Sequence, residues 1–339
     1  MCCYMDRQIS LKKIAEYAHV SVNTVSRALN DKDGVNEETR KKIKAIAEAF
    51  YYRPNLLARN MVHNQSGFIG IILGDMSNSF FIDILNGFEH EIDQISMSVL
   101  VGNSNENLEK ERRCLDSFLS YRCRGIAISP VAGDINLIQS LKNENVNFVV
   151  IDRPISNLEC STVSINNLKG SIEATEYLIS CGHSKIAYIG TVSTLTTEND
   201  RLTGYKTALF NHGIPINDAY IKLYDGTQDI DQICESLLML DPRPTAIYIS
   251  KANLGLITIM NLLKAGIHIP KDISVVLFGN PEWASIISPR ITCVQRPIYE
   301  IGQISAKLLI ENLYNEKPVI QNVLLDTELV IRDSVRNVT

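Results

Sequence analysis

The sequence predicts an α/β protein with a small all-helical domain at its N-terminus. The first 50 residues contain three short segments in which apolar residues recur with helical spacing. From Phe68 onward, apolar segments of strand length alternate with amphipathic helical segments. Charge divides at the same place, because residues 1–62 carry 11 Lys and Arg against 7 Asp and Glu, whereas the remainder carries 22 against 31. A basic block on an acidic body suggests that the block binds a polyanion.

The three N-terminal segments follow a helix-turn-helix pattern. Ser10, Ser21 and Asn36 each precede a segment with helical spacing, and all three are residue types that favour the N-cap position. Only the residues "HVS" separate the first segment from the second, which predicts a tight turn between two helices. The expected helices cover residues 11–18, 22–29 and 37–50.

The second of these helices carries side chains that can recognise DNA bases. Its apolar residues Val25, Ala28 and Leu29 face the predicted core. The residues left on the outward face are Val22, Asn23, Ser26 and Arg27. Asn pairs with adenine and Arg with guanine in the major groove, and Val can contact a thymine methyl group. The alternative is a solvated helix face of a small helical bundle.

Two stretches, "IAEYAHVSVNTVSRALN" and "YYRPNLLARNMVHNQSGFIGIIL", resemble the lactose/galactose repressor family (LacI/GalR) of bacterial transcription regulators. The resemblance implies a DNA-binding domain over residues 1–62 that ends in a hinge helix at about 54–62. In the family two hinge helices pair in the minor groove and insert a Leu between base pairs. Met61 occupies that place, and a core methionine is the alternative. The implied DNA contacts are Ser21, Val22, Asn23, Thr24, Ser26, Arg27, Asn30, Tyr52, Asn55, Ala58 and Met61.

The body of the chain predicts parallel sheets covered by helices. The expected strands are "GFIGIIL", "MSVLVG", "GIAIS", "NFVVID", "KIAYIG", "TAIYIS" and "ISVVLFG". Helical segments such as "FFIDILNGFEHEI" and "LEKERRCLDSFLSY" fall between them. Alternation of strands and helices at this period is typical of parallel sheets with helices on both faces.

The resemblance to the family extends over nearly the whole chain through stretches such as "DMSNSFF", "VVIDRP", "GHSKIAYIG" and "AGIHIPKDISVV". It implies that residues 66–339 form a core like that of periplasmic binding proteins, with two doubly wound parallel-sheet subdomains and a ligand cleft between them. We expect the first subdomain from residues 66–163 with 294–325. The second is expected from residues 164–293 with 326–339.

The resemblance also implies an effector pocket in that cleft. Family members bind sugars or purines with an Asp after the "VVID" strand, an Arg in Arg-x-x-Gly-Tyr, and polar groups near later strand ends. Carried over to this sequence, the pocket residues are Phe80, Phe81, Ser129, Asp152, Arg201, Lys251, Gly279, Asn280 and Arg296. For the two Phe residues a helix core is the alternative. For Asp152 and Arg201 the alternative is an ion pair.

Three of these positions depart from the family's pattern. Lys251 stands where Asn is usual, Gly279 where an Asp binds sugar hydroxyls, and Arg296 where Gln is usual. The change removes a carboxylate acceptor and adds two cations, which favours an anionic effector such as a sugar phosphate or a sugar acid. Drift without a change of ligand charge is the alternative.

The motifs of common enzyme classes do not occur in the sequence. No Gly-x-Gly-x-x-Gly follows the first strand, and there is no phosphate-binding loop, Gly-x-Ser-x-Gly turn or metal-binding His pair. We therefore expect neither an enzyme nor a cofactor or metal, and we expect His183 to be structural. A sugar-binding protein without DNA activity is the other alternative, and it would need an export signal.

Composition bounds the location and the partners. No apolar run has the length of a membrane span, and the 8 cysteines lack metal-ligand spacing, so a reduced cytoplasmic location is expected. The expected partners are double-stranded operator DNA of near-palindromic sequence, a second copy of the chain in a homodimer, and a small sugar-like effector. A phosphoprotein corepressor, as in the catabolite-control branch of the family, is the alternative to the small effector.

Overall fold

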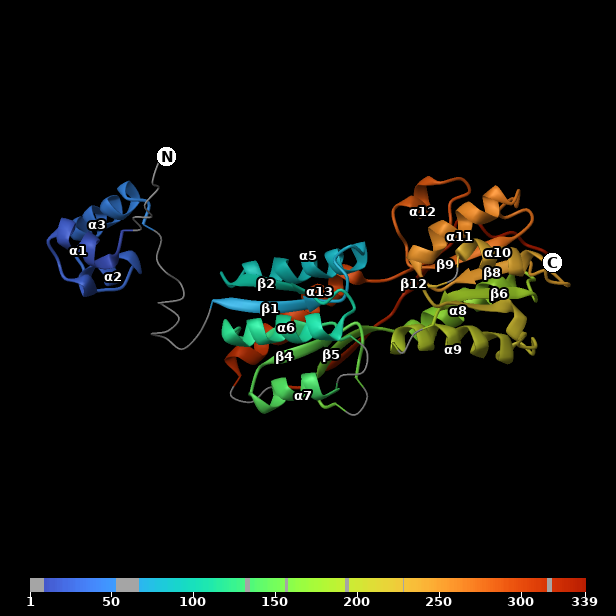
Figure 1. Cartoon of the computed structure of the whole chain (residues 1–339), viewed down its shortest axis with the longest axis horizontal. Helices are drawn as coiled ribbons and strands as arrows, with labels where there is room; N and C mark the ends of the chain where they lie inside the picture. Colours follow the sequence, from blue (N-terminus) through green and yellow to red (C-terminus); the bar gives the residue numbers. More distant parts are fainter. Residues whose placement is uncertain are drawn as a thin grey trace. The chain divides into compact units, whose positions relative to one another are not determined.

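The computed structural model forms two units, residues 1–65 and residues 66–339, which are described separately below (Figure 1). It describes residues 9–52, 67–131, 135–155, 158–192, 195–227, 229–315 and 319–339, without the side chains of 135–137. No helix of these ranges is long and apolar enough to cross a bilayer.

The first unit contains the three expected helices, α1 (Leu11–Ala18), α2 (Val22–Leu29) and α3 (Glu37–Ala49). Each begins after the predicted N-cap residue, whose side chain accepts a hydrogen bond from a backbone N–H of the first turn. Their apolar faces meet in a small core in which Ile14, Val25 and Ile43 are fully buried.

In the second unit, the first sheet has the strand order β11-β5-β4-β3-β1-β2, and all its pairs are parallel. Helices α5 and α13 pack on one face of the sheet, and α6 and α7 pack on the other. The strands are β1 (Phe68–Leu73), β2 (Ser98–Asn103), β3 (Ile126–Ile128), β4 (Phe148–Ile151), β5 (Ser161–Ile165) and β11 (Asn322–Leu325). The helices are α5 (Ser79–Asp93), α6 (Leu108–Ser120), α7 (Ile135–Asn143) and α13 (Ile298–Tyr314).

The second sheet has the strand order β12-β10-β9-β8-β6-β7. Helices α8 and α9 cover one face, whereas α10, α11 and the short α12 cover the other. The strands are β6 (Ile186–Thr191), β7 (Ile221–Tyr224), β8 (Ala246–Ile249), β9 (Ser274–Phe278), β10 (Thr292–Gln295) and β12 (Glu328–Val330). The helices are α8 (Asn167–Ser180), α9 (Thr196–Asn211), the 3-10 helix η1 (Asp218–Tyr220), α10 (Ile230–Leu238), α11 (Ala252–Lys264) and α12 (Trp283–Ile286).

The seven expected strands are all present, and two doubly wound sheets are the fold that the sequence predicted. One strand differs from the expected parallel arrangement, because β12 runs antiparallel to β10 at the edge of the second sheet. A parallel neighbour needs a crossover connection, usually a helix. β12 instead follows β11 after only two residues and enters the second sheet directly from the first.

The chain passes between the two sheets three times, and two of the passages lie slightly later than expected. Ser164 and Ile165 still pair with β11 in the first sheet, although they were expected in the second subdomain. Val294 pairs with β9 and β12 in the second sheet, although it was expected in the first subdomain. The reason is that β5 and β10 each continue to the end of their sheet before the chain leaves it.

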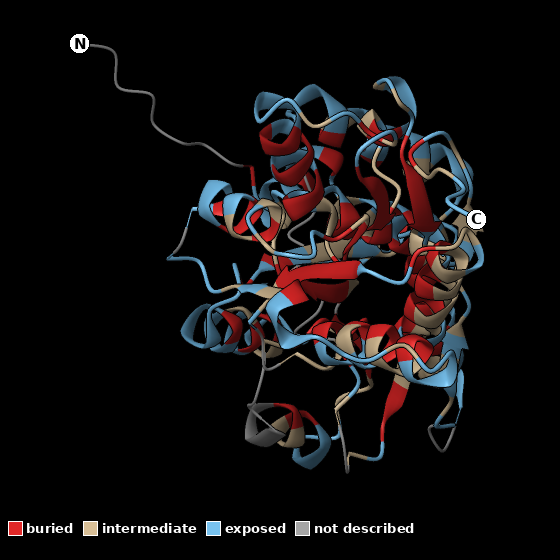
Figure 2. Cartoon of the chain, turned by 90° about the vertical axis from the view of Figure 1, so that its right-hand side faces the viewer, coloured by how far each residue is buried: buried red, intermediate tan, exposed pale blue. Residues whose placement is uncertain are grey.

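Both faces of each sheet are buried, which explains why the strands are continuous apolar runs (Figure 2). His183 is buried beside the second sheet, where its Nδ1 lies 2.9 Å from Thr245 Oγ1 and its Nε2 lies 3.2 Å from the carbonyl oxygen of Arg336. Burial lowers the pKa of His183, which favours the neutral ring. The side chain fastens the C-terminal segment to the sheet, as expected for a structural histidine.

Candidate functional site

Helix α2 presents a polar outer face at its N-terminal end. Ser21 Oγ accepts a hydrogen bond of 3.0 Å from the backbone N–H of Thr24 and lies 2.8 Å from Thr24 Oγ1. The next two side chains, Val22 and Asn23, are exposed, whereas Val25 is fully buried. This end of the helix therefore offers an apolar group and an amide for base contacts.

Arg27 differs from the expected outward-pointing base reader. Its Nε donates a 2.8 Å hydrogen bond to the carbonyl oxygen of Asp33, and its Nη2 donates to the same oxygen. The guanidinium group therefore holds the loop that follows α2. Asn30 is also engaged, because its Nδ2 donates a 2.7 Å hydrogen bond to the carbonyl oxygen of Ser26.

The hinge segment contributes only Tyr52 to the described part of the chain. Tyr52 is half-buried against the core of the three helices, and this burial raises the pKa of its phenol. The expected hinge helix at 54–62, with Asn55, Ala58 and Met61, lies outside the described residues.

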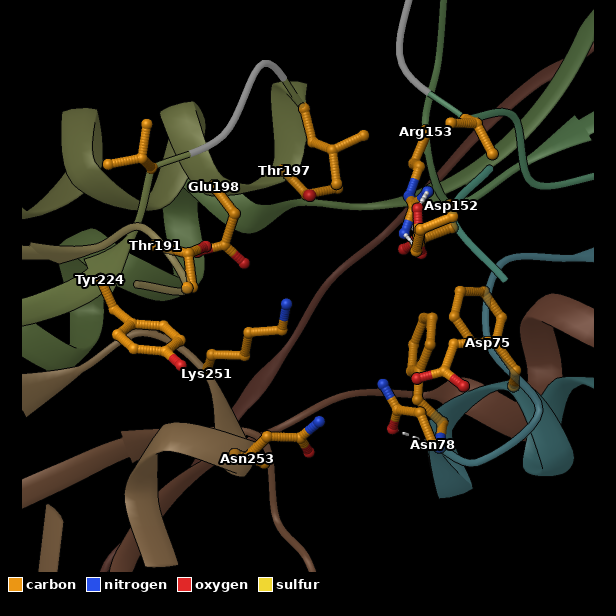
Figure 3. Close-up of a pocket in the computed structure, with 18 of the residues that line it drawn as sticks. Asp75, Asn78, Asp152, Arg153, Thr191, Thr197, Glu198, Tyr224, Lys251 and Asn253 are labelled. Carbon is orange, nitrogen blue, oxygen red and sulfur yellow. Dashed lines mark hydrogen bonds and ion pairs between the residues drawn. The ribbon is translucent and has the colours of Figure 1, made fainter. Parts of the chain in front are cut away.

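A cleft of about 990 Å³ lies between the carboxyl ends of the two sheets. Residues that follow strands β4, β6, β7, β8 and β9 meet there with the N-terminal turns of helices, as expected for parallel α/β sheets. Figure 3 shows Asp152 and Asp75 on one side of the space and Glu198, Tyr224 and Lys251 on the other. The predicted residues that line the cleft are Phe80, Phe81, Asp152, Arg201, Lys251 and Arg296.

Three predicted pocket residues do not line the cleft. Ser129 is fully buried, and its backbone N–H donates to the carbonyl oxygen of Ile72 inside the sheet. Asn280 bonds Gln295 Oε1 and Arg332 Nη2 at 2.8 Å each, which makes it part of the packing of the second subdomain. Gly279 lies beneath Arg296 and has a φ of +106°, a left-handed conformation that favours glycine.

Asp152 and Arg153 belong to an internal ion-pair cluster on the first-subdomain side of the cleft. The guanidinium group of Arg153 binds both carboxylate oxygens of Glu106, at 2.6 and 2.7 Å, and its Nε lies 3.5 Å from Asp152 Oδ2. Asp152 also has a φ of +64°, which is uncommon outside glycine. The cluster therefore fixes the turn after β4 and leaves Arg153 neutralised.

Arg201 is neutralised in the same way on the second-subdomain side. Its Nη1 lies 2.9 Å from Glu198 Oε1 and donates to the carbonyl oxygen of Ser250, while its Nε donates to Asn167 Oδ1. The guanidinium carbon lies 4.2 Å from the centre of the Phe278 ring. The ion-pair alternative therefore describes Arg201 and Asp152, although both also line the cleft.

Lys251 and Arg296 are the cations of the cleft that make no hydrogen bond or ion pair with the residues that the structure describes. The guanidinium carbon of Arg296 lies 4.4 Å from the centre of the Phe80 ring, and its buried Nε has no hydrogen-bond partner among these residues. Burial, followed by the nearby charge of Arg201, lowers the pKa of Arg296 to about 10. The ammonium group of Lys251 points into the space (Figure 3).

Comparison with known proteins decides the family. Residues 10–55 match the model described as "Bacterial regulatory proteins, lacI family", and residues 175–335 match a "Periplasmic binding protein-like domain". Over 339 residues the chain is 31% identical to the "Probable HTH-type transcriptional repressor ExuR" of Bacillus subtilis (strain 168), with coverage of 98% of this chain and 99% of the relative. The chain belongs to the lacI family of bacterial regulatory proteins.

Other lacI-family relatives agree with this assignment. The chain is 29% identical over 332 residues to "Catabolite control protein A" of Priestia megaterium, with 97% of this chain and 99% of the relative covered. Its fold matches a crystal structure of the lac repressor dimer bound to operator and the anti-inducer ONPF, with a TM-score of 0.87, 24% identity, and coverage of 97% and 100%. The protein is a DNA-binding transcriptional repressor of the lacI family and not an enzyme, because its relatives are transcription regulators.

For this lacI-family protein, sequence reasoning missed several residues that line the cleft. Thr191 could have been found, because it directly follows a predicted strand and strand ends face the cleft. Tyr224 ends β7, whose short sequence "IKLY" contains a Lys and was not predicted as a strand. The other missed lining residues that carry polar groups are Asp75, Asn78, Glu106, Arg153, Thr197, Glu198 and Asn253.

Proposed function

We propose that this lacI-family repressor controls a carbohydrate-utilisation operon and responds to a small sugar-like effector bound in the cleft. The observation that carries the proposal is the cleft itself, in the same chain as a helix-turn-helix domain. Its lining combines carboxylates, cations and the aromatic rings of Phe80 and Tyr224. A concave site with aromatic walls and a few polar groups suits a small polyhydroxylated molecule.

For DNA binding, we propose that α2 enters the major groove and that Val22 and Asn23 contact base edges. Arg27 joins them when its side chain leaves the carbonyl oxygen of Asp33. Asn55, Ala58 and Met61 remain proposed hinge contacts, with Met61 as the apolar wedge in the minor groove.

We further propose that the repressor binds a near-palindromic operator as a homodimer. Operator symmetry mirrors the twofold symmetry of a dimer. Helix α11 supports the proposal because Leu256, Ile257, Met260 and Leu263 are between 38% and 50% exposed and lie along one side of the helix. The similar lac repressor structure is described as a dimer on its operator.

The proposed regulation is allosteric. A ligand that contacts both walls of the cleft favours one arrangement of the two subdomains, and that arrangement sets the spacing of the two DNA-binding domains in the dimer. The effector is proposed to carry an acidic group, as a sugar phosphate or a sugar acid does, since Lys251 and Arg296 face the cleft without protein partners among the described residues.

The test begins with selection of operator DNA from a random pool by the full-length protein. Fluorescence anisotropy then measures the affinity of wild type and Asn23→Ala for the selected site and for random DNA. The substitution should weaken operator binding by about 1–3 kcal/mol and leave random-DNA binding nearly unchanged, because a base contact carries sequence information. Asn143→Ala, an exposed asparagine in the second unit, is the matched control.

Equal losses on operator and random DNA would show that Asn23 does not read bases. Failure of wild type to select any sequence would contradict the proposed function. If operator binding responds to a phosphorylated protein but to no sugar or sugar derivative, the corepressor alternative replaces the small effector.

A further inference from the structure

Four residues from three distant parts of the sequence form one continuous patch in the cleft. They are Lys251 and Ala252 at the start of α11, Gly279 after β9, and Arg296 after β10. A Cβ atom built on Gly279 would lie 3.3 Å from Cβ of Ala252 and 3.2 Å from Nη2 of Arg296. The positions where this chain departs from its family are therefore neighbours, which is unexpected for independent drift.

The small residues of the patch make room for the arginine. Gly279 has no side chain, so the guanidinium group of Arg296 lies directly over its backbone. On its other side the same group lies over the Phe80 ring. Arg296 is thus held between an aromatic ring and a glycine, a position that orients the group and offers it no acceptor.

The charge of the patch is not balanced by the described residues. Arg153 and Arg201, the other two arginines of the cleft, are each paired with carboxylates. Lys251 and Arg296 make no ion pair within the described ranges, and Arg296 Nε is buried without an acceptor there. An unpaired cation that is removed from water is costly, so the patch favours an anion.

Helix α11 adds to this preference. It has 13 residues, and its N-cap residue Lys251 makes no side-chain hydrogen bond to the first turn. The N-terminal N–H groups of a helix carry partial positive charge and bind anions readily. The helix start, Lys251 and Arg296 therefore act on the same side of the cleft.

We propose that this patch binds the acidic group of the effector, a carboxylate or a phosphate, through Arg296 and Lys251. The proposal rests on the proposed function and adds where the acid binds: not at Arg201 or Arg153, which are already neutralised. The hydroxyl groups of the same molecule then face Asp152 and Asp75 on the opposite wall (Figure 3), where carboxylates accept hydrogen bonds.

The position of Arg296 also assigns it a part in regulation. It lies on the segment that leads from β10 in the second sheet to α13 on the first. Its side chain contacts Phe80 at the start of α5 and lies over Gly279 after β9. An acid bound to Arg296 is therefore held at the junction of the subdomains, so a charged effector should change operator affinity more than its neutral parent.

The test compares three full-length proteins: wild type, the double variant Lys251→Asn/Arg296→Gln, and the control Lys271→Asn/Arg113→Gln. The control makes the same substitutions at exposed positions outside the cleft. Thermal unfolding is followed with inorganic phosphate or acetate against chloride of equal ionic strength. At least one anion should stabilise wild type and control, and its dissociation constant should rise about 10-fold or more in the double variant.

Equal responses of all three proteins, or no response of wild type to either anion, would overturn the proposal. A second arm uses glucose 6-phosphate, glucuronate and glucose. A stronger response to the phosphate or to the acid identifies the charged group. A stronger response to glucose than to both charged derivatives also overturns the proposal.

Operator binding without ligand separates this proposal from the proposed function. All three proteins should bind the selected operator equally, because the substitutions lie outside the DNA-binding domain. Retained operator binding with an anion-insensitive wild type contradicts only the anion patch, whereas absent operator binding contradicts the proposed function. If the double variant does not fold, Lys251→Asn alone gives the same test, because Lys251 makes no cap or ion-pair contact within the described ranges.

Discussion

Glu198 shows what a single residue does for the cleft. Its side chain and that of Arg201 are only 6% and 7% exposed, and they pair at 2.9 Å. Removal of one partner leaves the other charge buried and uncompensated. We expect Glu198→Ala to lower the free energy of unfolding by about 3–5 kcal/mol. Urea unfolding followed by fluorescence measures this, since Trp283, the chain's single tryptophan, packs against the core of the second subdomain.

Glu176→Ala is the control for this prediction. Glu176 lies 3.7 Å from His212 in a pair whose side chains are 40% and 44% exposed, and exposed pairs contribute about 1 kcal/mol or less. Similar losses for the two variants would mean that the Glu198–Arg201 pair does not stabilise the subdomain more than a surface pair does.

At the scale of the element, α2 depends on its N-cap. Ser21 supplies a side-chain acceptor for the backbone N–H of Thr24, which has no partner within the helix. Ser21→Ala should destabilise the helix by about 1 kcal/mol. Hydrogen exchange of α2 amides in the full-length protein measures this as faster opening, and operator affinity should fall with it.

Ser26→Ala changes the same residue type on the same helix without touching the cap. Its effect on exchange should stay within about 0.5 kcal/mol. If both variants accelerate exchange equally, the Ser21 cap is not what stabilises the start of α2.

At the scale of the whole molecule, the proposed dimer depends on the exposed side of α11. Ile257 is 46% exposed within a stripe of apolar side chains, and a charge placed there cannot be buried against a second copy without a partner. Ile257→Glu should therefore yield monomers in analytical ultracentrifugation and weaken operator binding. Met239→Glu, at a residue that is 82% exposed and outside the stripe, should remain dimeric. A dimeric Ile257→Glu variant would place the interface elsewhere.

The sequence alone determined the local elements of this protein. Ser10, Ser21 and Asn36 predicted where three helices begin, because an N-cap acts within one helical turn. The longer apolar strands were also evident, since parallel strands are buried on both faces. Short strands such as β7 and β12 were missed, because four or fewer partly exposed residues do not produce an apolar run.

Only the tertiary structure decided how the charges of the cleft are partnered. The sequence placed Arg201, Lys251 and Arg296 in one pocket but could not show that Arg201 is paired with Glu198 while the other two face open space. Nor could it show that Gly279 lies against Arg296. Capping and periodicity act over a few residues, whereas the partner of a charge depends on which distant segments the packed sheets bring together.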